Sequence, residues 1–193
     1  VQRDATRAAV VLPIDDREKS IRQATKEAYE KAVAYAGSAH GNHDLWKAYI
    51  VFVRSWRTEG DHVLANEQMV QLRSVFQKLV VQPMTGLDQM WKDYEAFERA
   101  QNEALAAALI SEWDPKYRHA RTIYLERNRI CSSEALQLGR LATPPTEDDA
   151  GRKEEQALLT LWKTRCAYER TNPERLNPTE FLNRVRMMFR EMA

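Results

Sequence analysis

Two histidines near residue 40 are the first side chains of this sequence whose spacing could do chemistry. His40 and His43 flank Gly41-Asn42, and two imidazoles at this spacing can bind one metal ion. No third ligand is evident and the segment reads as a turn before a helix, so we expect a structural or solvated role. Cys166 lies in an apolar helical pattern, and we expect a small buried side chain there rather than a nucleophile. The acidic run Glu147-Asp148-Asp149 could coordinate a cation, but a solvated acidic loop is the commoner use of such a run.

Glutamates and arginines recur at related positions. Glu98 and Glu169 occupy the same place relative to a preceding tryptophan, and we expect each to bind an arginine or a backbone group near a helix end. Two groups of arginines could contact RNA or an acidic partner: Arg118, Arg121, Arg127 and Arg129, and then Arg184, Arg186 and Arg190. Solvated faces with salt bridges to nearby glutamates are the more ordinary use of such residues.

The motifs of common enzyme classes are not found. The sequence has no phosphate-binding glycine loop, no His-Glu-x-x-His and no nucleophile elbow. We therefore predict that the chain is not an enzyme and uses no metal or other cofactor.

Composition restricts the partners and the compartment. The 29 Lys and Arg against 28 Asp and Glu leave a net charge of +1, whereas proteins that mainly grip nucleic-acid phosphates carry a basic excess. RNA binding is therefore expected to be weak or indirect. The only cysteines are Cys131 and Cys166, which fits a reducing cytosolic or nuclear compartment. No apolar run approaches the roughly 18 residues of a membrane helix.

The elements that must position these residues come as repeats. One pattern, here the A pattern, occurs at Leu45–Val53, Met90–Glu98 and Leu161–Glu169: an apolar residue, Trp-Lys, a large residue three after the Trp and an aromatic six after it. On a helix these offsets share one face, so each copy predicts a helix with an aromatic stripe in the core. The predicted core residues are Trp46, Tyr49, Phe52, Trp91, Tyr94, Phe97, Trp162 and Tyr168.

A second pattern, the B pattern, alternates with the first. It occurs at Lys26–Ala32, Arg73–Leu79, Arg121–Arg127 and Arg186–Met192, each with an aromatic in the middle of an amphipathic helix. The aromatics are Tyr29, Phe76, Tyr124 and Phe189, which we also predict to be core. Alternating helix pairs whose apolar faces need neighbours predict an all-α solenoid of antiparallel pairs, and such solenoids bind other proteins along an extended surface.

Turn residues set the expected boundaries. Asp114-Pro115 and Asn177-Pro178 each place a capping side chain before a proline at a helix start, and Gly37, Gly60 and Gly86 fall between helices. We predict one domain over residues 1–193, with repeats at about 1–38, 39–82, 83–130 and 158–193. A proline-rich and acidic loop is expected over 131–157, because Pro144-Pro145 cannot continue a helix.

Together the two patterns resemble the half-a-TPR (HAT) repeat of RNA-processing scaffolds. Within that group the sequence resembles the suppressor-of-forked family, the scaffold subunit of cleavage stimulation factor. The resemblance runs from about Asp16 onward, and Arg165 departs from it, because the repeat usually has an aromatic there. The segments that carry the resemblance are Val81–Met84, Asp88–Glu98, Asn102, Leu105-Ala106, Tyr117–Arg121, Leu141–Thr146, Trp162-Lys163 and Tyr168–Pro173.

The resemblance implies a function and a set of partners. Family members have two HAT blocks, of which this chain would be most of the N-terminal one, part of a longer nuclear protein. That block would dock on the polyadenylation specificity factor, while other cleavage stimulation subunits would bind outside this fragment. The C-terminal block dimerises, so the fragment is expected to be monomeric and its parent a homodimer. The alternatives are a HAT scaffold of splicing or ribosome assembly, or an RNA-binding module that uses the arginines of the B helices.

Overall fold

The computed structural model describes residues 16–37, 42–130 and 149–192, and these residues form α-helices and no β-strand. The all-α prediction is confirmed. The first repeat's residues 1–15, His40 and most of the predicted proline loop, with Glu147-Asp148, lie outside the described residues. The helices are α1 (Asp16–Ala36), α2 (His43–Arg54), α3 (His62–Leu79), α4 (Leu87–Gln101), α5 (Glu103–Ile130), α7 (Asp149–Arg170) and α8 (Pro178–Met192).

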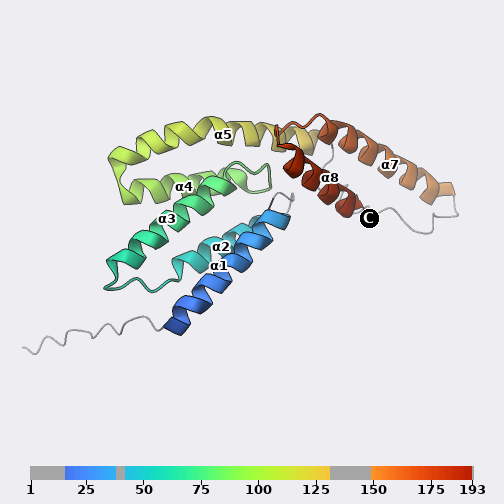
Figure 1. The fold of residues 1–193 in the computed structure, drawn as a ribbon. Coiled ribbons are helices and arrows are strands. Elements are labelled where there is room, and N and C mark those ends of the chain that lie inside the picture. The colour runs from blue at the N-terminus through green and yellow to red at the C-terminus, as the bar shows by residue number, and fades with distance from the viewer. Residues whose placement is uncertain (1–15, 38–41, 131–148, 193) are drawn as a thin grey trace, which may run out of the picture.

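The helices stack in chain order (Figure 1). The A pattern falls on α2, α4 and α7, and the B pattern on α1, α3, α5 and α8. Each A helix packs against the B helix that follows it, as in α4 with α5, and against the B helix that precedes it, as in α3 with α4. This sequential packing is that of a helical-repeat solenoid. None of the helices in the described ranges is long and apolar enough to cross a membrane.

One aromatic contact is repeated between successive pairs. Tyr29 of α1 stacks on Tyr49 of α2, with ring centroids 5.0 Å apart, and also lies 5.3 Å from Phe52. Phe76 of α3 makes the equivalent contacts with Tyr94 at 6.0 Å and Phe97 at 5.4 Å. The middle aromatic of a B helix therefore packs against the stripe of the next A helix, and these contacts hold successive repeats together.

Most of the predicted core aromatics are buried. Of the twelve, those with under a tenth of their surface exposed are Trp46, Tyr49, Trp91, Tyr94, Phe97, Trp162 and Phe76, and the half-buried ones are Tyr29, Phe52, Tyr124 and Tyr168. Phe189 departs from the prediction, because it is 49% exposed. Its equivalents Tyr29 and Phe76 are each covered by a following A helix, and within the described residues no helix follows α8.

Close packing at the end of α1 explains a glycine there. The indole Nε1 of Trp46 donates a hydrogen bond of 3.0 Å to the carbonyl of Gly37. A Cβ on Gly37 would clash with the Val33 carbonyl oxygen at the end of α1 and would lie only 3.0 Å from the Trp46 ring of α2. Gly37 therefore suits both the end of α1 and the close approach of Trp46, whereas Gly86, with φ of 79°, supplies the left-handed residue that starts α4.

Helix starts agree only in part with the predicted punctuation. Asn177 caps α8, because its Oδ1 accepts bonds from the amides of Thr179 (3.1 Å) and Glu180 (3.0 Å). The predicted start at Asp114-Pro115 is wrong, because Pro115 lies inside α5. The cap of α5 is Asn102, whose Oδ1 accepts from the amides of Ala104 (3.0 Å) and Leu105 (3.2 Å). Asp114 instead pairs with Arg118, at 2.8 Å, within the helix.

The last repeat begins earlier than predicted. Helix α7 starts at Asp149, so residues 149–157 are helical and do not belong to a loop. An acidic residue in the first turn complements the helix dipole, and Asp149 also pairs with Arg152 at 2.6 Å. The polar composition that suggested a loop also suits the solvated end of a long helix.

Candidate interaction surface

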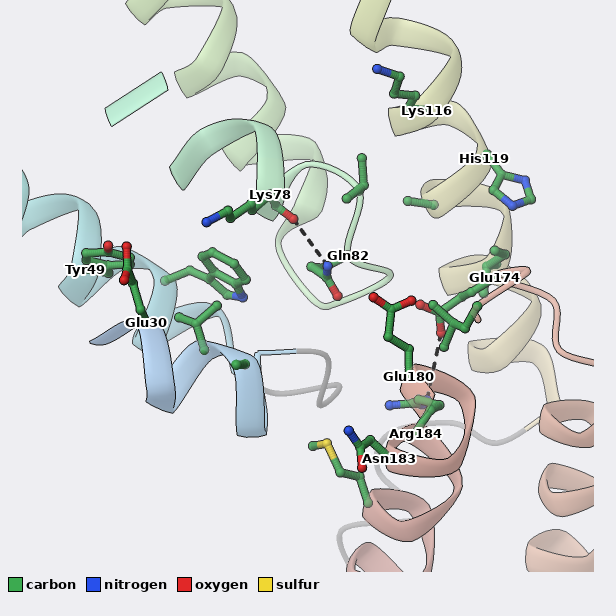
Figure 2. Close-up of a pocket in the computed structure, with 18 residues that line it drawn as sticks. Glu30, Tyr49, Lys78, Gln82, Lys116, His119, Glu174, Glu180, Asn183 and Arg184 are labelled. Carbon is green, nitrogen blue, oxygen red and sulfur yellow. Dashed lines mark hydrogen bonds and ion pairs between the residues drawn. The ribbon is translucent and has the colours of Figure 1, made fainter. Parts of the chain in front are cut away.

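A groove lies between the two ends of the helical stack (Figure 2). It is a cavity of about 790 Å³ bounded by α1 and α2 on one side, the end of α3 and the middle of α5 on another, and α8 with the loop before it. This volume falls within the range of about 300–1,000 Å³ typical of binding pockets. Apolar side chains from each side contribute to its lining, among them Val33, Val81, Ile123, Leu176 and Met187.

The α7–α8 loop reaches the groove because of its backbone conformation. Asn172 and Arg175 have φ of 52° and 55°, and the Asn172 side chain makes two bonds of 2.9 Å with the backbone of Leu176, one donated and one accepted. Asparagine tolerates the left-handed region and closes such turns with its amide. The loop is thereby folded so that Glu174 and Leu176 line the groove.

Charges divide the groove into two sides. Lys78 of α3 and Lys116 of α5 lie on its upper side in Figure 2, and Glu30 of α1 and Glu180 of α8 lie below them. Lys116 also pairs with Glu112 at 3.1 Å and sits 3.7 Å above the Trp113 ring. The groove therefore has two lysines on one side and two carboxylates on the other, with apolar side chains in its lining. Arg184, which also lines the groove, is bonded to Glu169.

A buried ion cluster holds one wall of the groove. Glu169 of α7 is 1% exposed and receives Arg127 of α5 in a two-pronged contact of 2.7 and 2.8 Å. Arg165 Nε and Arg184 Nη2 donate to the same carboxylate, at 3.0 and 3.2 Å. Arg127 also bonds Glu174 in the loop. The cluster thus ties α5, α7, α8 and the loop together.

The electrostatics of this cluster favour the ionised forms. Burial by itself would raise the pKa of Glu169, but the hydrogen bond from Arg127 and the charges of Arg184 and Arg127 lower it to about 2. Burial would lower the pKa of Arg127, and its bond to Glu169 and the charge of Glu174 raise it overall. The carboxylate and the guanidinium are therefore charged partners at neutral pH.

A simpler version of this contact occurs one repeat earlier. Glu98 of α4, also 1% exposed, receives Arg73 of α3 through two bonds of 2.8 Å. The prediction that Glu98 and Glu169 bind an arginine is confirmed at both positions. In both junctions the arginine comes from the preceding B helix.

A second polar cluster joins α4 to α5. Asp88 accepts bonds from the Tyr117 hydroxyl at 2.7 Å and from Arg121 Nε at 2.9 Å, and Tyr117 stacks on Trp91 with centroids 4.6 Å apart. The Arg121 hydrogen bond lowers the pKa of Asp88, whereas burial and the bond to Asp88 raise that of Tyr117 to about 12. These residues belong to the segments that carry the family resemblance, and here they fix the hairpin of α4 and α5.

The seven arginines predicted as possible contacts do not act alike. Arg127 and Arg184 are 1% and 3% exposed inside the ion cluster, so their assignment to a partner surface is wrong. Arg118 and Arg121 pair with Asp114 and Asp88. Arg129, Arg186 and Arg190 are exposed, and Arg190 contacts Tyr35 of α1. Burial separates Arg127 and Arg184 from the exposed arginines, and the sequence pattern by itself does not reveal which arginines are buried.

The remaining chemical candidates have structural places. His43 is the first residue of α2 and lies 3.3 Å from Asp44. Cys166 is half-buried beside a smaller hollow of about 380 Å³, and burial raises the pKa of its thiol. In the part of the chain that the structure describes, no three His, Cys, Asp or Glu side chains are grouped to hold a metal ion.

Sequence reasoning missed the groove, two residues of the ion cluster around Glu169 (Arg165 and Glu174), and Arg73, the partner of Glu98. Arg73, Arg165 and Glu174 gave no direct signal, although Arg165 was noticed as a departure from an aromatic position. That departure is the available signal. Tyr49 and Tyr94 occupy the equivalent position in the other repeats and are buried, so a charged residue at this position requires a buried partner.

Known proteins match this chain over most of its length. Residues 10–192 match the family described as Suppressor of forked protein (Suf). Cleavage stimulation factor subunit 77 of Arabidopsis thaliana is 30% identical over 167 residues, covering 85% of this chain and 21% of that protein. Protein suppressor of forked of Drosophila melanogaster is 33% identical over 163 residues, covering 84% and 20%.

A fungal relative adds a more distant comparison. The mRNA 3′-end-processing protein RNA14 of Gibberella zeae is 25% identical over 162 residues, covering 82% of this chain and 16% of that protein. The chain spans about a fifth or less of the length of these relatives.

Proposed function

Since this chain belongs to the suppressor of forked family, we propose that it is a non-catalytic, protein-binding scaffold of the nuclear machinery that forms mRNA 3′ ends. The observation that carries the proposal is the match to 3′-end-processing proteins over more than four fifths of the chain. A solenoid of stacked helix pairs with a groove between its ends suits a protein that holds others.

The finer part of the proposal concerns partners. We infer that this chain docks on the polyadenylation specificity factor, and that other cleavage stimulation subunits bind the parent protein outside it. By itself the chain is expected to be monomeric, with a homodimeric parent. The burial of Arg127 and Arg184 weighs against the alternative of a module that binds RNA through these arginines.

A capture experiment tests the proposal. The chain is used as bait in nuclear extract with RNase present, and bound proteins are identified by mass spectrometry. Enrichment of polyadenylation specificity factor subunits is expected. Enrichment of splicing or ribosome-assembly proteins instead would overturn the pathway, and capture that disappears with RNase would favour direct RNA binding.

A pair of variants on α4 distinguishes loss of capture caused by unfolding from the effect of changing an exposed side chain. Trp91 is buried in the centre of the stack, so Trp91→Ala should unfold or loosen the chain and abolish capture. Lys92→Ala changes an exposed neighbour on the same helix and should leave capture intact.

A further inference from the structure

The groove between α1, α3, α5 and α8 has a chemistry that selects its occupant. Its lining includes the apolar side chains of Val33, Val81 and Met187. Lys78 and Lys116 border one side, and Glu30 and Glu180 border the other. A ligand that fills the groove must therefore be apolar on one face and carry opposite charges on its two edges.

The walls favour a helix over an extended peptide. A peptide that binds as a β-strand needs unpaired backbone groups along a sheet edge. The groove is bounded mostly by helices, whose interior backbone groups are already bonded within each helix. An amphipathic helix needs only an apolar surface, and it binds through side chains at i, i+3 or i+4, and i+7.

The acidic edge weighs against nucleic acid. A phosphate backbone presents one sign of charge, so Glu30 and Glu180 would repel it while Lys78 and Lys116 attracted it. Glu174, a further carboxylate in the lining, is already bonded to Arg127. A helix with one acidic and one basic edge satisfies both sides at once.

We propose that the groove binds one amphipathic helix of a partner protein, with acidic residues toward Lys78 and Lys116 and basic residues toward Glu30 and Glu180. The inference rests on the proposed scaffold function and specifies the chemistry of its partner. The apolar stripe of this helix packs against the apolar side chains of the lining, among them Val33, Val81 and Met187.

Three synthetic helical peptides test this occupant. All have leucines at i, i+3 and i+7; the first has glutamates on one edge and lysines on the other, the second glutamates on both edges and the third lysines on both. Binding to the chain is measured by fluorescence anisotropy at physiological salt. The mixed-edge peptide is expected to bind tightest, by on the order of tenfold, since it gains two or more exposed ion pairs.

Charge reversal makes the test specific to the groove. In the double variant K78E/K116E both edges become acidic, so the preference should change to the all-lysine peptide. In E30K/E180K both become basic, and the all-glutamate peptide should bind best. Circular dichroism confirms that each variant remains folded. Failure of all three peptides to bind, or a ranking that charge reversal leaves unchanged, would overturn the inference, as would a uridine-rich RNA that binds the groove more tightly than the peptides.

The capture experiment separates this inference from the function on which it rests. If the reversed variants still capture polyadenylation specificity factor as well as the native chain does, the scaffold function holds and the groove is not its docking site. If the native chain captures none, the proposed function fails whatever the peptides do. Loss of capture in the reversed variants, together with the changed peptide preference, would support both.

Discussion

Glu169 is the carboxylate around which the last repeat junction is organised, because three arginines donate to it in a buried place. Replacing Glu169 with Gln would leave these guanidinium groups buried with one fewer negative charge. We expect Glu169→Gln to lower the free energy of unfolding by roughly 3–5 kcal/mol at pH 7. Urea denaturation measures the loss. Glu95→Gln, in a half-exposed pair with Arg99 at 3.9 Å, serves as control and should cost less than about 1 kcal/mol.

The same carboxylate predicts a pH dependence. The pKa of Glu169 falls from its ordinary value of 4.5 to about 2 on folding. The stabilisation is therefore complete above pH 4.5 and is lost as the pH falls toward 2. In native protein the unfolding free energy should fall over this window more steeply than in Glu169→Gln. Parallel curves for the two proteins would show that Glu169 is not held ionised by its arginines.

The sequence predicted part of this cluster and missed the rest for a physical reason. Glu98 and Glu169 could be predicted because they share a repeat position beside a buried stripe. Arg127 was assigned to the surface because an arginine on an amphipathic helix is usually solvated, and its burial depends on α7, whose partner residue is distant in sequence. Arg165 was unexpected because it occupies a tyrosine position.

A substitution at Pro115 tests whether helix α5 continues through this residue. A proline inside a helix costs about 3 kcal/mol relative to alanine, and its restriction of the unfolded chain offsets about 0.4–1 kcal/mol of this. Because α5 is continuous from Glu103 to Ile130, Pro115→Ala should raise the free energy of unfolding by roughly 2 kcal/mol. Thermal unfolding followed by circular dichroism measures it. Pro178, the first residue of α8, is the matched control, since Pro178→Ala should be neutral or slightly destabilising; equal effects at the two sites would contradict an interior Pro115.

Asn102 makes the complementary prediction at the start of the same helix. Its side chain accepts bonds from two amides that have no partner within the helix. Asn102→Ala should therefore destabilise the chain by about 1 kcal/mol. Asn66, exposed in the interior of α3, provides the control, because Asn66→Ala removes no cap and slightly favours the helix. A smaller loss at Asn102 than at Asn66 would exclude the capping role.

The prediction of helix boundaries from the sequence required knowing which polar residue caps each helix. Asn177-Pro178 was predicted correctly, whereas Asp114-Pro115 has the same composition and lies inside a helix. The difference is tertiary: α5 packs along α4 over a long contact, which outweighs the cost of one proline. Residues 149–157 were likewise assigned to a loop from composition, although a solvated helix end has the same residues.

At the scale of the whole molecule, repeat periodicity predicted the all-α stack but not how its ends meet. Arg190 near the end of α8 lies over the ring of Tyr35 near the end of α1, 5.0 Å from its centroid, and also donates to its hydroxyl. Such a contact depends on small rotations between successive pairs that accumulate along a solenoid, which local patterns do not encode.

This contact should influence shape more than stability. Both side chains are exposed, so the double variant Y35A/R190A should lower the free energy of unfolding by less than about 1 kcal/mol. Without the contact, α1 and α8 can separate, and the radius of gyration from small-angle X-ray scattering should increase. Glu18→Ala, an exposed change near the start of α1 and several turns from Tyr35, should leave scattering unchanged. If the double variant scatters like native protein, the spacing of the two ends is set by packing within the repeats, and the peptide affinity of the groove should then be unaffected by loss of Tyr35 and Arg190.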